Sequence, residues 1–376
     1  MSALVIVALV CLLLFLHPYT LYPLSIMLFP ARPVRRDPGA PRPTASAVFA
    51  AYNEARSIPA KIANLRAIHE LAPDIEFIAY ADLSSDATLS MLQAEPDLVT
   101  VIAATERTGK ATGMEKMVAM ARGEICIFTD ANVTLDPASI APLLSYFSDP
   151  EVGGVAGTLL YVNEGESTTA KAGGLYWRLE ERVKQLESRC GSIMGADGSI
   201  FATRRALYPV VPPHLLDDMT TSMSVTFHGK RLVHATDVIA YEKSATSSSD
   251  EFRRKRRIAC RAFNTHRHLW PAIRKTYSAA DLYKYVSHKI LRWFGIVPLA
   301  LLILFGGAAM ILAQLWYTLA VILALGAVLF GLAVAGVQPF ALLVEILKSI
   351  IATFVGVVDS MRGKTYQTWE PAKSRD

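Results

Sequence analysis

The chain has 376 residues, of which 52% are hydrophobic, and its formal net charge at pH 7 is +5. This length allows one large domain or two smaller ones, and the mean hydropathy of +0.32 excludes an ordinary soluble protein. The few excess basic residues lie mostly beside apolar stretches, which indicates a membrane surface rather than a nucleic-acid partner.

The first predicted element is a membrane-spanning helix in residues 1–30. No Asp, Glu, Lys or Arg occurs from Met1 to Ala31, and this block is long enough for one span. A cleaved signal peptide is the alternative, but basic residues follow the block rather than precede it, and no small-residue cleavage site is obvious. Residues 31–44 are rich in Pro and Arg, so they predict a linker that leaves the membrane.

Strand-like and helix-like runs alternate through the segment 45–245. The strand-like runs cover residues 46–51, 76–81, 98–103 and 124–129, and the helix-like runs cover residues 57–70, 86–94 and 111–122. Such alternation predicts an α/β domain with right-handed βαβ units and a mostly parallel sheet. After Asp149 the pattern loosens, with a possible strand at 152–162, a long helix at 170–189 and a second half from 193 to 242.

The rest of the chain predicts further membrane contacts. Residues 246–292 predict basic interfacial helices, because six basic side chains fall between Glu251 and Arg261. Residues 293–337 carry no charge and predict two spans, with a break near residues 314–317. Residues 338–376 predict an interfacial or re-entrant helix and a tail. A fourth span is the alternative, although Glu345 and Lys348 would be costly at a bilayer centre.

Basic residues flank these apolar blocks. They follow the first block at Arg32, Arg35 and Arg36, and they precede the second at Lys284, Lys289 and Arg292. By the positive-inside rule the middle of the chain is cytoplasmic. The four scattered cysteines fit a reducing compartment, because none shows disulfide or metal-site spacing.

Polar and acidic side chains follow three of the predicted strands. Asn53 and Glu54 follow the first strand, Asp82 follows the second, and Asp130 and Asn132 follow the fourth. In open α/β sheets, ligands bind beyond the carboxyl ends of the strands. An Asp with an oxygen-bearing side chain two residues later can hold a hard cation against phosphate oxygens. Taken singly, each Asp is more often a helix or turn cap.

Two other motifs could carry chemistry. Lys110 follows Gly109 at the start of a predicted helix, which suits a phosphate group, although the P-loop spacing is absent. Asp217 and Asp218 are adjacent acids, so the pKa of one is expected to rise through repulsion and partial burial. A carboxylate of raised pKa can accept a proton from a hydroxyl group. The alternative is a helix N-cap pair.

Together these segments resemble family 2 glycosyltransferases of the GT-A fold, in the membrane-bound bacterial branch that builds cell-surface polysaccharides. The resemblance rests on the segments Ala51-Tyr-Asn53-Glu54, Asp82-Leu-Ser-Ser-Asp86, Gly109-Lys110-Ala111, Asp130-Ala-Asn132, Gly195-Ala-Asp197-Gly198-Ser199, Leu216-Asp217-Asp218-Met219 and Arg362-Gly…Trp369-Glu-Pro371. It implies an inverting enzyme with a UDP-sugar donor and a divalent cofactor, Mg²⁺ or Mn²⁺.

The resemblance also implies roles for individual residues. Asn53, Glu54 and Asp82 would bind the nucleoside, and Asp130 with Asn132 would hold the metal ion on the diphosphate. Asn132 departs from the usual second Asp, which weakens the expected hold on the metal. Asp218 would be the catalytic base, supported by Asp217.

Basic residues complete the implied site. Lys110, Arg254 and Arg257 would neutralise the leaving diphosphate. Arg254-x-x-Arg257-Ile258 stands where processive relatives carry Gln-x-x-Arg-Trp, so the Gln and Trp are replaced. Trp369 is expected to fold back toward the membrane or the acceptor.

The resemblance implies an enzyme of the bacterial inner membrane, multi-pass, with its catalytic domain in the cytoplasm. The implied partners are a lipid-linked or saccharide acceptor, membrane lipids and polysaccharide-assembly proteins. Three alternatives remain: a processive polysaccharide synthase, a transferase to polyprenyl phosphate, and a non-catalytic membrane scaffold.

Overall fold

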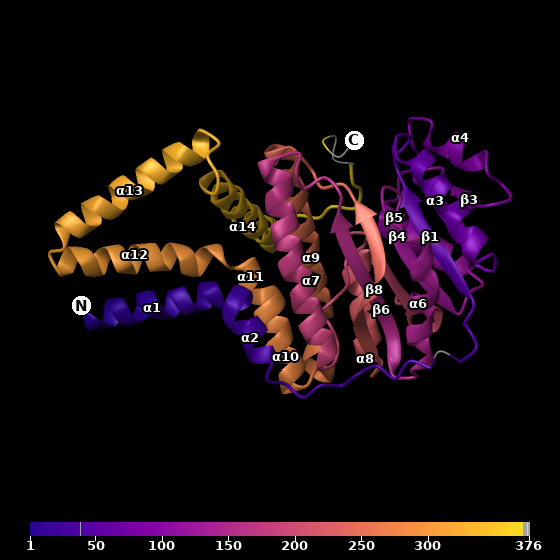
Figure 1. Cartoon of the computed structure of the whole chain (residues 1–376), viewed down its shortest axis with the longest axis horizontal. Helices are drawn as coiled ribbons and strands as arrows, with labels where there is room; N and C mark the ends of the chain where they lie inside the picture. Colours follow the sequence, from indigo (N-terminus) through magenta and orange to yellow (C-terminus); the bar gives the residue numbers. More distant parts are fainter. Residues whose placement is uncertain (38, 371–373, 375–376) are drawn as a thin grey trace.

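A twisted mixed sheet forms the centre of the fold (Figure 1). The computed structural model describes residues 1–37, 39–370 and 374, and in these residues eight strands make one sheet of order β3-β2-β1-β4-β7-β6-β8-β5. The strands are β1 (Ala45–Ala51), β2 (Glu76–Ala81), β3 (Thr100–Ala103), β4 (Ile125–Asp130), β5 (Thr134–Leu135), β6 (Val152–Tyr161), β7 (Ile200–Arg204) and β8 (Arg231–Glu242).

The four strands from β3 to β4 are parallel, so the carboxyl ends of β1, β2 and β4 meet at one edge. β7 then runs antiparallel to both β4 and β6, and β6 pairs in parallel with β8. The N-terminus of β7 therefore lies at the same edge as the carboxyl end of β4. This arrangement places Asp130 beside the turn that precedes β7.

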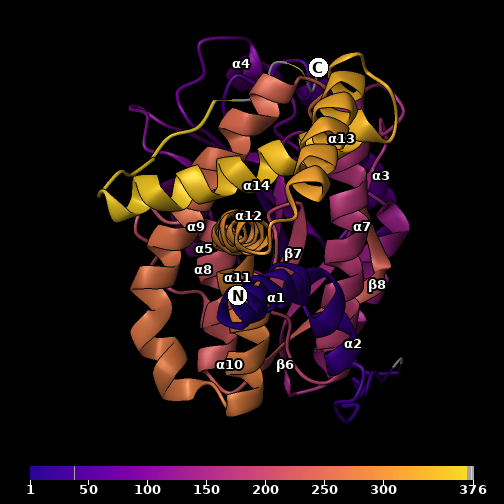
Figure 2. The same cartoon turned by 90° about the vertical axis from the view of Figure 1, so that its left-hand side faces the viewer.

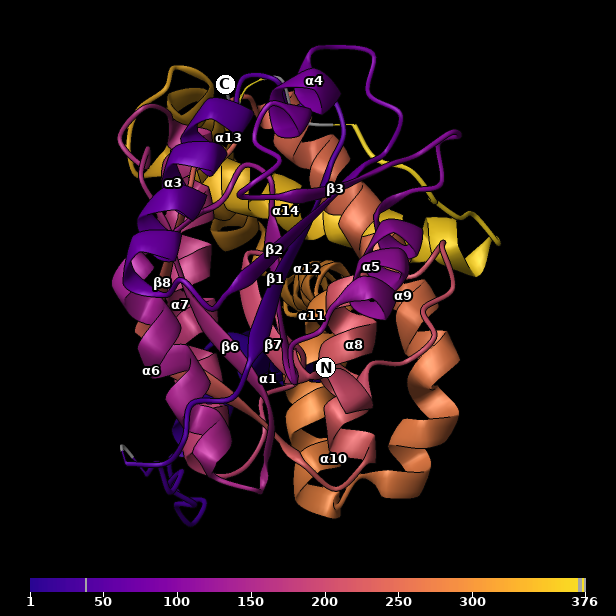
Figure 3. The same cartoon turned by 90° about the vertical axis from the view of Figure 1, so that its right-hand side faces the viewer.

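Helices cover both faces of the sheet, as Figure 3 shows. The helices of this domain are α3 (Ile58–Leu71), α4 (Thr88–Gln93), α5 (Lys110–Met120), α6 (Ile140–Ser145), α7 (Thr168–Arg189) and α8 (Asp217–Phe227), with 3₁₀ turns at Pro137–Ser139, Tyr146–Ser148 and Arg205–Leu207. β1 is buried along its whole length. Alternate β1 side chains pack with α3 and α6 on one face and with α5 and α8 on the other, as the two-residue period of a strand requires.

The remaining helices extend from one side of this domain (Figure 1). They are α1 (Ser2–Leu16), a π-helical turn (His17–Leu21), α2 (Tyr22–Ile26), α9 (Ser248–Thr276), α10 (Ala279–Tyr285), a second π-helical turn (Val286–Ile290), α11 (Leu291–Trp293), α12 (Ile296–Leu312), α13 (Trp316–Val334) and α14 (Phe340–Met361). α1 and α12 lie side by side and project away from the sheet. α7 and α9 stand between the sheet and these apolar helices.

Three helices of the described chain are long and apolar enough to cross a membrane: Ser2–Ile26, Trp316–Val334 and Phe340–Met361. A fourth candidate is the pair Ala279–Trp293 and Ile296–Leu312, which bends by 67°. α14 lies across the direction of α12, which Figure 2 views along its axis. Glu345 of α14 accepts hydrogen bonds from Thr169 and Ser248, so it lies against α7 and α9, and the choice between an interfacial helix and a fourth span stays a prediction.

The fold class expected from the sequence is confirmed. The domain is α/β, with a mixed, mostly parallel sheet and long apolar helices at both ends. The longer predicted strands match closely, whereas β3 begins two residues later than predicted.

Candidate active site

Hydrogen bonds join the loops after β1 and β2 at the carboxyl edge of the sheet. The Asn53 backbone has a positive φ of 52°, and its side-chain oxygen accepts a hydrogen bond from the Ser85 N–H at 2.8 Å. The Ser57 hydroxyl donates to the Glu54 carboxylate at 2.9 Å, at the start of α3. Both side chains thus shape the loop at the expected nucleoside site, and their contact with a nucleoside stays a prediction.

Asp82 organises the segment that leads into α5. Its side chain is fully buried, and its carboxylate accepts hydrogen bonds from the N–H groups of Thr108 at 2.8 Å and Gly109 at 3.0 Å. The Arg107 guanidinium lies 3.6 Å from the same carboxylate. Gly109 has a φ of +88°, a conformation that L side chains rarely adopt, so glycine is needed here. Asp82 therefore fixes the loop that presents Lys110.

Lys110 lies among three carboxylates. Its Nζ is 2.6 Å from Oδ1 of Asp130 and 3.4 Å from Oδ2 of Asp217. Burial opposes the charged form of Lys110, but Asp130, Asp217 and Asp218 outweigh it and hold its pKa above the usual value. The ammonium group is consequently charged at neutral pH.

Gly198 marks the point where these groups meet. A Cβ atom at this position would lie 3.0 Å from Nζ of Lys110, 3.3 Å from Oδ2 of Asp218 and 3.5 Å from Oδ2 of Asp130. A side chain here would occupy the space between a cation and two carboxylates. The structure thus brings together Lys110, Asp130 and the adjacent pair Asp217 and Asp218, which come from three separate segments of the sequence.

Asp218 has the properties of a base. It lies in the first turn of α8, and its Oδ1 accepts a hydrogen bond from the Met219 N–H at 2.6 Å. Burial and the adjacent Asp217 charge raise the pKa of Asp218 to about 7, against the opposing effect of Lys110. A carboxylate of this pKa is ionised in part at neutral pH and can accept a proton more readily than an ordinary Asp.

Part of this arrangement lies in a segment that is similar to a known protein family. Residues 46–210 match the family model described as Glycosyl transferase family 2. This segment of the chain is therefore similar to family 2 glycosyltransferases. The match contains Asn53, Glu54, Asp82, Lys110 and Asp130, whereas Asp218 lies just beyond it.

One solved structure shares the fold of this chain over nearly its whole length, which confirms the expected GT-A fold. The mannosyltransferase PcManGT from Pyrobaculum calidifontis, in complex with GDP-Man and Mn²⁺, is 22% identical, with a TM-score of 0.73 over 96% of this chain and 99% of its own. GalNAc-T7 with UDP, GalNAc and Mn²⁺ is 15% identical, with a TM-score of 0.41 over 54% of this chain and 44% of its own. Glucosyl-3-phosphoglycerate synthase from Mycobacterium tuberculosis, in complex with phosphoglyceric acid, is 16% identical, with a TM-score of 0.42 over 59% of this chain and 80% of its own. No curated protein matches the chain.

The expected metal ligands fit a hard divalent cation. Oδ1 of Asp130 pairs with Lys110, which leaves Oδ2 beside the Gly198 space. The Asn132 amide N–H₂ donates to Oε1 of Glu242 at 3.1 Å, and this leaves the amide oxygen as the group able to coordinate. The described residues contain no cluster of three or more His, Cys, Asp or Glu side chains arranged for a metal. One carboxylate and one amide suit an ion that takes its other ligands from phosphate and water.

Lys61 supports this site and was missed by the sequence analysis. Its Nζ donates to the backbone carbonyls of Asp130 at 3.0 Å and Val133 at 2.9 Å, so it secures the turn that carries Asn132. Burial lowers the pKa of Lys61 to about 7. The signal in the sequence was a lysine on the apolar face of α3, between Ile58 and Leu65.

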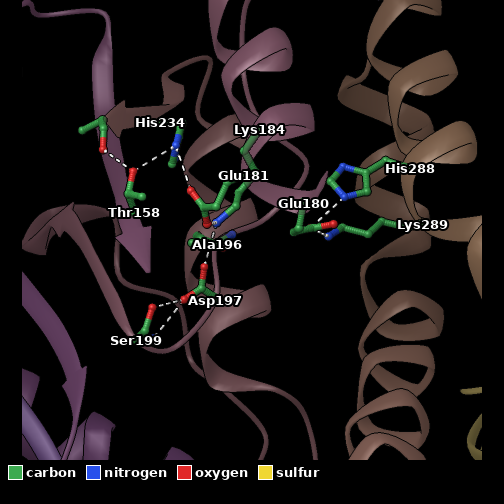
Figure 4. A network of polar contacts seen from close by, with 12 residues as sticks. Thr158, Glu180, Glu181, Lys184, Ala196, Asp197, Ser199, His234, His288 and Lys289 are labelled. Atoms are coloured by element: carbon green, nitrogen blue, oxygen red, sulfur yellow. Dashed lines mark hydrogen bonds and ion pairs between the residues drawn. The ribbon is translucent and has the colours of Figure 1, made fainter. Parts of the chain in front are cut away.

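A buried polar network holds the Gly198 turn from the other side (Figure 4). Lys184 on α7 pairs with Oδ2 of Asp197 at 3.0 Å and also with Glu181. The Asp197 carboxylate in turn accepts from the Ser199 N–H at 3.1 Å. The next acid on α7, Glu180, lies 2.8 Å from Nε2 of His288, in the π-helical turn beside the membrane helices. α7 therefore joins the Gly198 turn to the helices at the apolar end of the molecule.

The basic helix α9 has several distinct partners. Arg254 lies 3.4 Å from Glu251 and lines a cavity that also reaches Asp218. Arg256 forms two hydrogen bonds with Asp359 on α14, at 2.6 and 3.0 Å, and so fastens α9 to the amphipathic helix. Arg257 is half-buried on the same helix. Contact of Arg254 or Arg257 with a diphosphate stays a prediction.

The C-terminal tail packs against the loops that follow β1 and β3. The Trp369 ring lies 6.0 Å from the Tyr52 ring at an angle of 70°, and the Trp369 carbonyl accepts a hydrogen bond from Arg107. The Arg107 guanidinium lies 3.1 Å from the centre of the Tyr52 ring. Aromatic and hydrogen-bond contacts thus hold Trp369 against Tyr52 and Arg107, and its expected turn toward the membrane or the acceptor stays a prediction. Residues 371–373, which include Pro371, lie outside the described chain.

Proposed function

We propose that this protein is a membrane-anchored, inverting glycosyltransferase that moves a hexosyl group from a nucleotide sugar to a hydroxyl group. The observation that carries the proposal is the meeting of Lys110, Asp130 and Asp218 around Gly198. A diphosphate needs positive charge and an acceptor hydroxyl needs a base. These side chains supply both within one small space.

In the proposed reaction the acceptor oxygen attacks the anomeric carbon from the face opposite the nucleotide. The bond from that carbon to the diphosphate oxygen breaks as the new glycosidic bond forms, and Asp218 takes the acceptor proton. Lys110 faces the charge that develops on the leaving diphosphate, and fixed charges of this kind stabilise a transition state more than a ground state. Asp217 maintains the raised pKa of Asp218 through its charge.

The other predicted site residues bind the donor in this proposal. Asn53, Glu54 and Asp82 shape the nucleoside end, and Arg254 and Arg257 approach the diphosphate from α9. Asp130 and Asn132 would hold Mg²⁺ or Mn²⁺, which when bound supplies Lewis-acid stabilisation of the diphosphate.

The proposal also covers the nucleotide-sugar donor, the cellular compartment and the bounds of the domains. A UDP-sugar is the donor that the sequence favours, and GDP-sugars belong in the test because PcManGT binds GDP-Man. The glycosyltransferase domain spans residues 45–245 and lies on the cytoplasmic side of a bacterial inner membrane, with three spans as the sequence predicts. The acceptor then reaches the site from the membrane side, where α7 and α9 meet the apolar helices.

Nucleotide release from a panel of sugar donors tests the proposal. Purified protein is incubated with Mn²⁺, a membrane lipid extract and each UDP- or GDP-sugar in turn. We expect one donor or a few related donors to release nucleotide, with a labelled product of inverted anomeric configuration. If none of the donors is consumed, the proposed function is wrong.

A further inference from the structure

A cavity of about 410 Å³ extends from Asp218 to the apolar helices. This volume lies within the range of sites that bind small molecules. At its inner end the lining includes Asp218 and the turn from Gly195 to Asp197. At its outer end the lining includes Phe15 of α1 and Ile346 of α14, which belong to segments long and apolar enough to span a membrane. A ligand of this cavity can therefore reach from the bilayer to the proposed catalytic base.

Four basic side chains in the cavity wall share two carboxylates: Arg254 and Lys255 pair with Glu251, and Lys289 and Arg292 pair with Glu180. The Lys255 and Lys289 ammonium groups lie 3.7 and 3.6 Å from these carboxylates, which is too far for a hydrogen bond. Their side chains are 17% and 20% exposed. Both ammonium groups can therefore donate hydrogen bonds to a ligand. Lys184, the fifth basic residue of the lining, differs, because Asp197 and Glu181 both pair with it.

The Tyr176 ring lies between the two pairs of cations. Nζ of Lys255 is 4.7 Å from the centre of this ring, and the Arg292 guanidinium is 5.9 Å from it. The same guanidinium is 5.6 Å from the centre of the Tyr19 ring, beside the apolar end of the cavity. Burial lowers the pKa of Lys255, so an anion bound beside Tyr176 would stabilise its charged form.

A lipid phosphate is the anion that fits this position. Phosphate oxygens accept strong hydrogen bonds from Lys and Arg, and basic pockets between membrane helices bind phosphate-bearing head groups. Phe15, Trp293, Ile346 and Ile350 offer apolar surface to a hydrocarbon chain at the outer end. A free phosphate or a nucleotide would leave that surface in contact with water, whereas a lipid chain would cover it.

We propose that this cavity binds the phosphate of an anionic lipid acceptor, with Lys255, Lys289 and Arg292 around the phosphate. The apolar chain leaves past α1 and α14, and a hydroxyl group beyond the phosphate reaches Asp218. The inference rests on the proposed function and narrows its acceptor. In the reaction the hydroxyl oxygen bonds to the anomeric carbon, the nucleoside diphosphate departs with the electrons of the broken bond, and the proton passes to Asp218. The lipid phosphate stays intact.

Two matched pairs of lipids test the charge of the head group. One pair is phosphatidylinositol and monogalactosyldiacylglycerol with the same acyl chains, and the other is polyprenyl diphosphate galactose and polyprenyl galactoside. Native mass spectrometry measures their binding to the full-length protein without a sugar donor. We expect the anionic lipid of at least one pair to bind at least tenfold more tightly than its neutral partner, and that pair identifies the source of the phosphate. Equal binding within both pairs, or tighter binding of the neutral lipids, overturns the inference.

The lipid-binding result is independent of the nucleotide-release assay. If no donor is consumed, the proposed function is wrong even where the anionic lipid binds. If a donor is consumed, the preferred lipid should carry the labelled sugar on a hydroxyl oxygen. A product with the sugar bonded to a phosphate oxygen, or transfer to none of the four lipids, overturns the inference and leaves sugar transfer itself intact.

Substitutions in the cavity wall test the location. Lys255→Gln and Lys289→Gln each remove one charge, from different elements, and each should weaken binding of the anionic lipid at least fivefold, with binding of the neutral lipid and the KM for the donor unchanged. Lys275→Gln is the matched control, because Lys275 is an exposed residue of α9, the helix of Lys255, and lies outside the lining. If both cavity variants bind the anionic lipid within twofold of this control, the phosphate binds elsewhere and the inference is wrong.

Discussion

Replacing Gly198 by alanine is expected to slow sugar transfer while the protein stays folded. The added methyl carbon would lie 3.0 Å from Nζ of Lys110 and 3.3 Å from Oδ2 of Asp218. Ordinary contacts to a carbon atom are about 3.5–4.0 Å, so these charged groups must move by about 0.5 Å. Both are ends of side chains rather than backbone, and therefore the fold can absorb the change.

The cost should appear in the reaction rate. A misplacement of about 1 Å in a catalytic group can reduce the rate about 100-fold. We therefore expect kcat/KM to fall about 10- to 100-fold, equivalent to about 1.4–2.7 kcal/mol of transition-state stabilisation. The free energy of unfolding should change by less than about 1 kcal/mol, because the new methyl group displaces only side-chain ends.

Initial rates of nucleotide release and thermal unfolding measure the two effects separately. Gly165→Ala is the control, because nothing lies within 4 Å of the position that its Cβ would occupy. This control should match the wild type in both assays. A folded Gly198→Ala enzyme with activity within twofold of the wild type would refute the idea that the reaction occurs in this space.

Four further predictions follow from the same site. Because burial and Asp217 raise the pKa of Asp218 to about 7 and the base works when ionised, kcat/KM should rise with pH through about 7; a profile flat from pH 5.5 to 8.5 would contradict this. Lys61→Met should cost about 2 kcal/mol in unfolding free energy, because two buried carbonyls lose their donor, and Mn²⁺ titration should show weaker binding. Asn132→Asp should lower the Mn²⁺ concentration for half-maximal activity several-fold, and a chelator should abolish activity in both forms. Trp369→Ala should raise the donor KM several-fold, with kcat nearly unchanged, because the ring packs against Tyr52 at the proposed nucleoside end.

Local sequence patterns predicted the sheet well. The strand at residues 76–81 has the predicted bounds, because a continuous apolar run between polar turn residues has few alternative structures. The predicted ends of α4 and α5 agree less closely with the structure, because the ends of short helices depend on contacts with the sheet. The general shape of the domain therefore follows from periodicity alone.

The site could be predicted only in part. The resemblance brought Asp130, Lys110 and Asp218 together, whereas their actual distances depend on β7 joining the sheet beside β4. The role of Lys61 depends on a contact across many residues, which no local pattern reveals. The position of Trp369 could not be predicted, because it rests on packing against Tyr52 and Arg107 at the opposite end of the sequence.

The activity of Asp218→Asn tests the central claim most directly. The asparagine keeps the size of the side chain but cannot take a proton from the acceptor. We expect donor binding, measured by titration with the nucleotide sugar, to stay within threefold of the wild type, while kcat falls about 1,000-fold or more. Turnover at the wild-type rate by the folded variant would show that Asp218 is not the base, and the account of the site would be wrong.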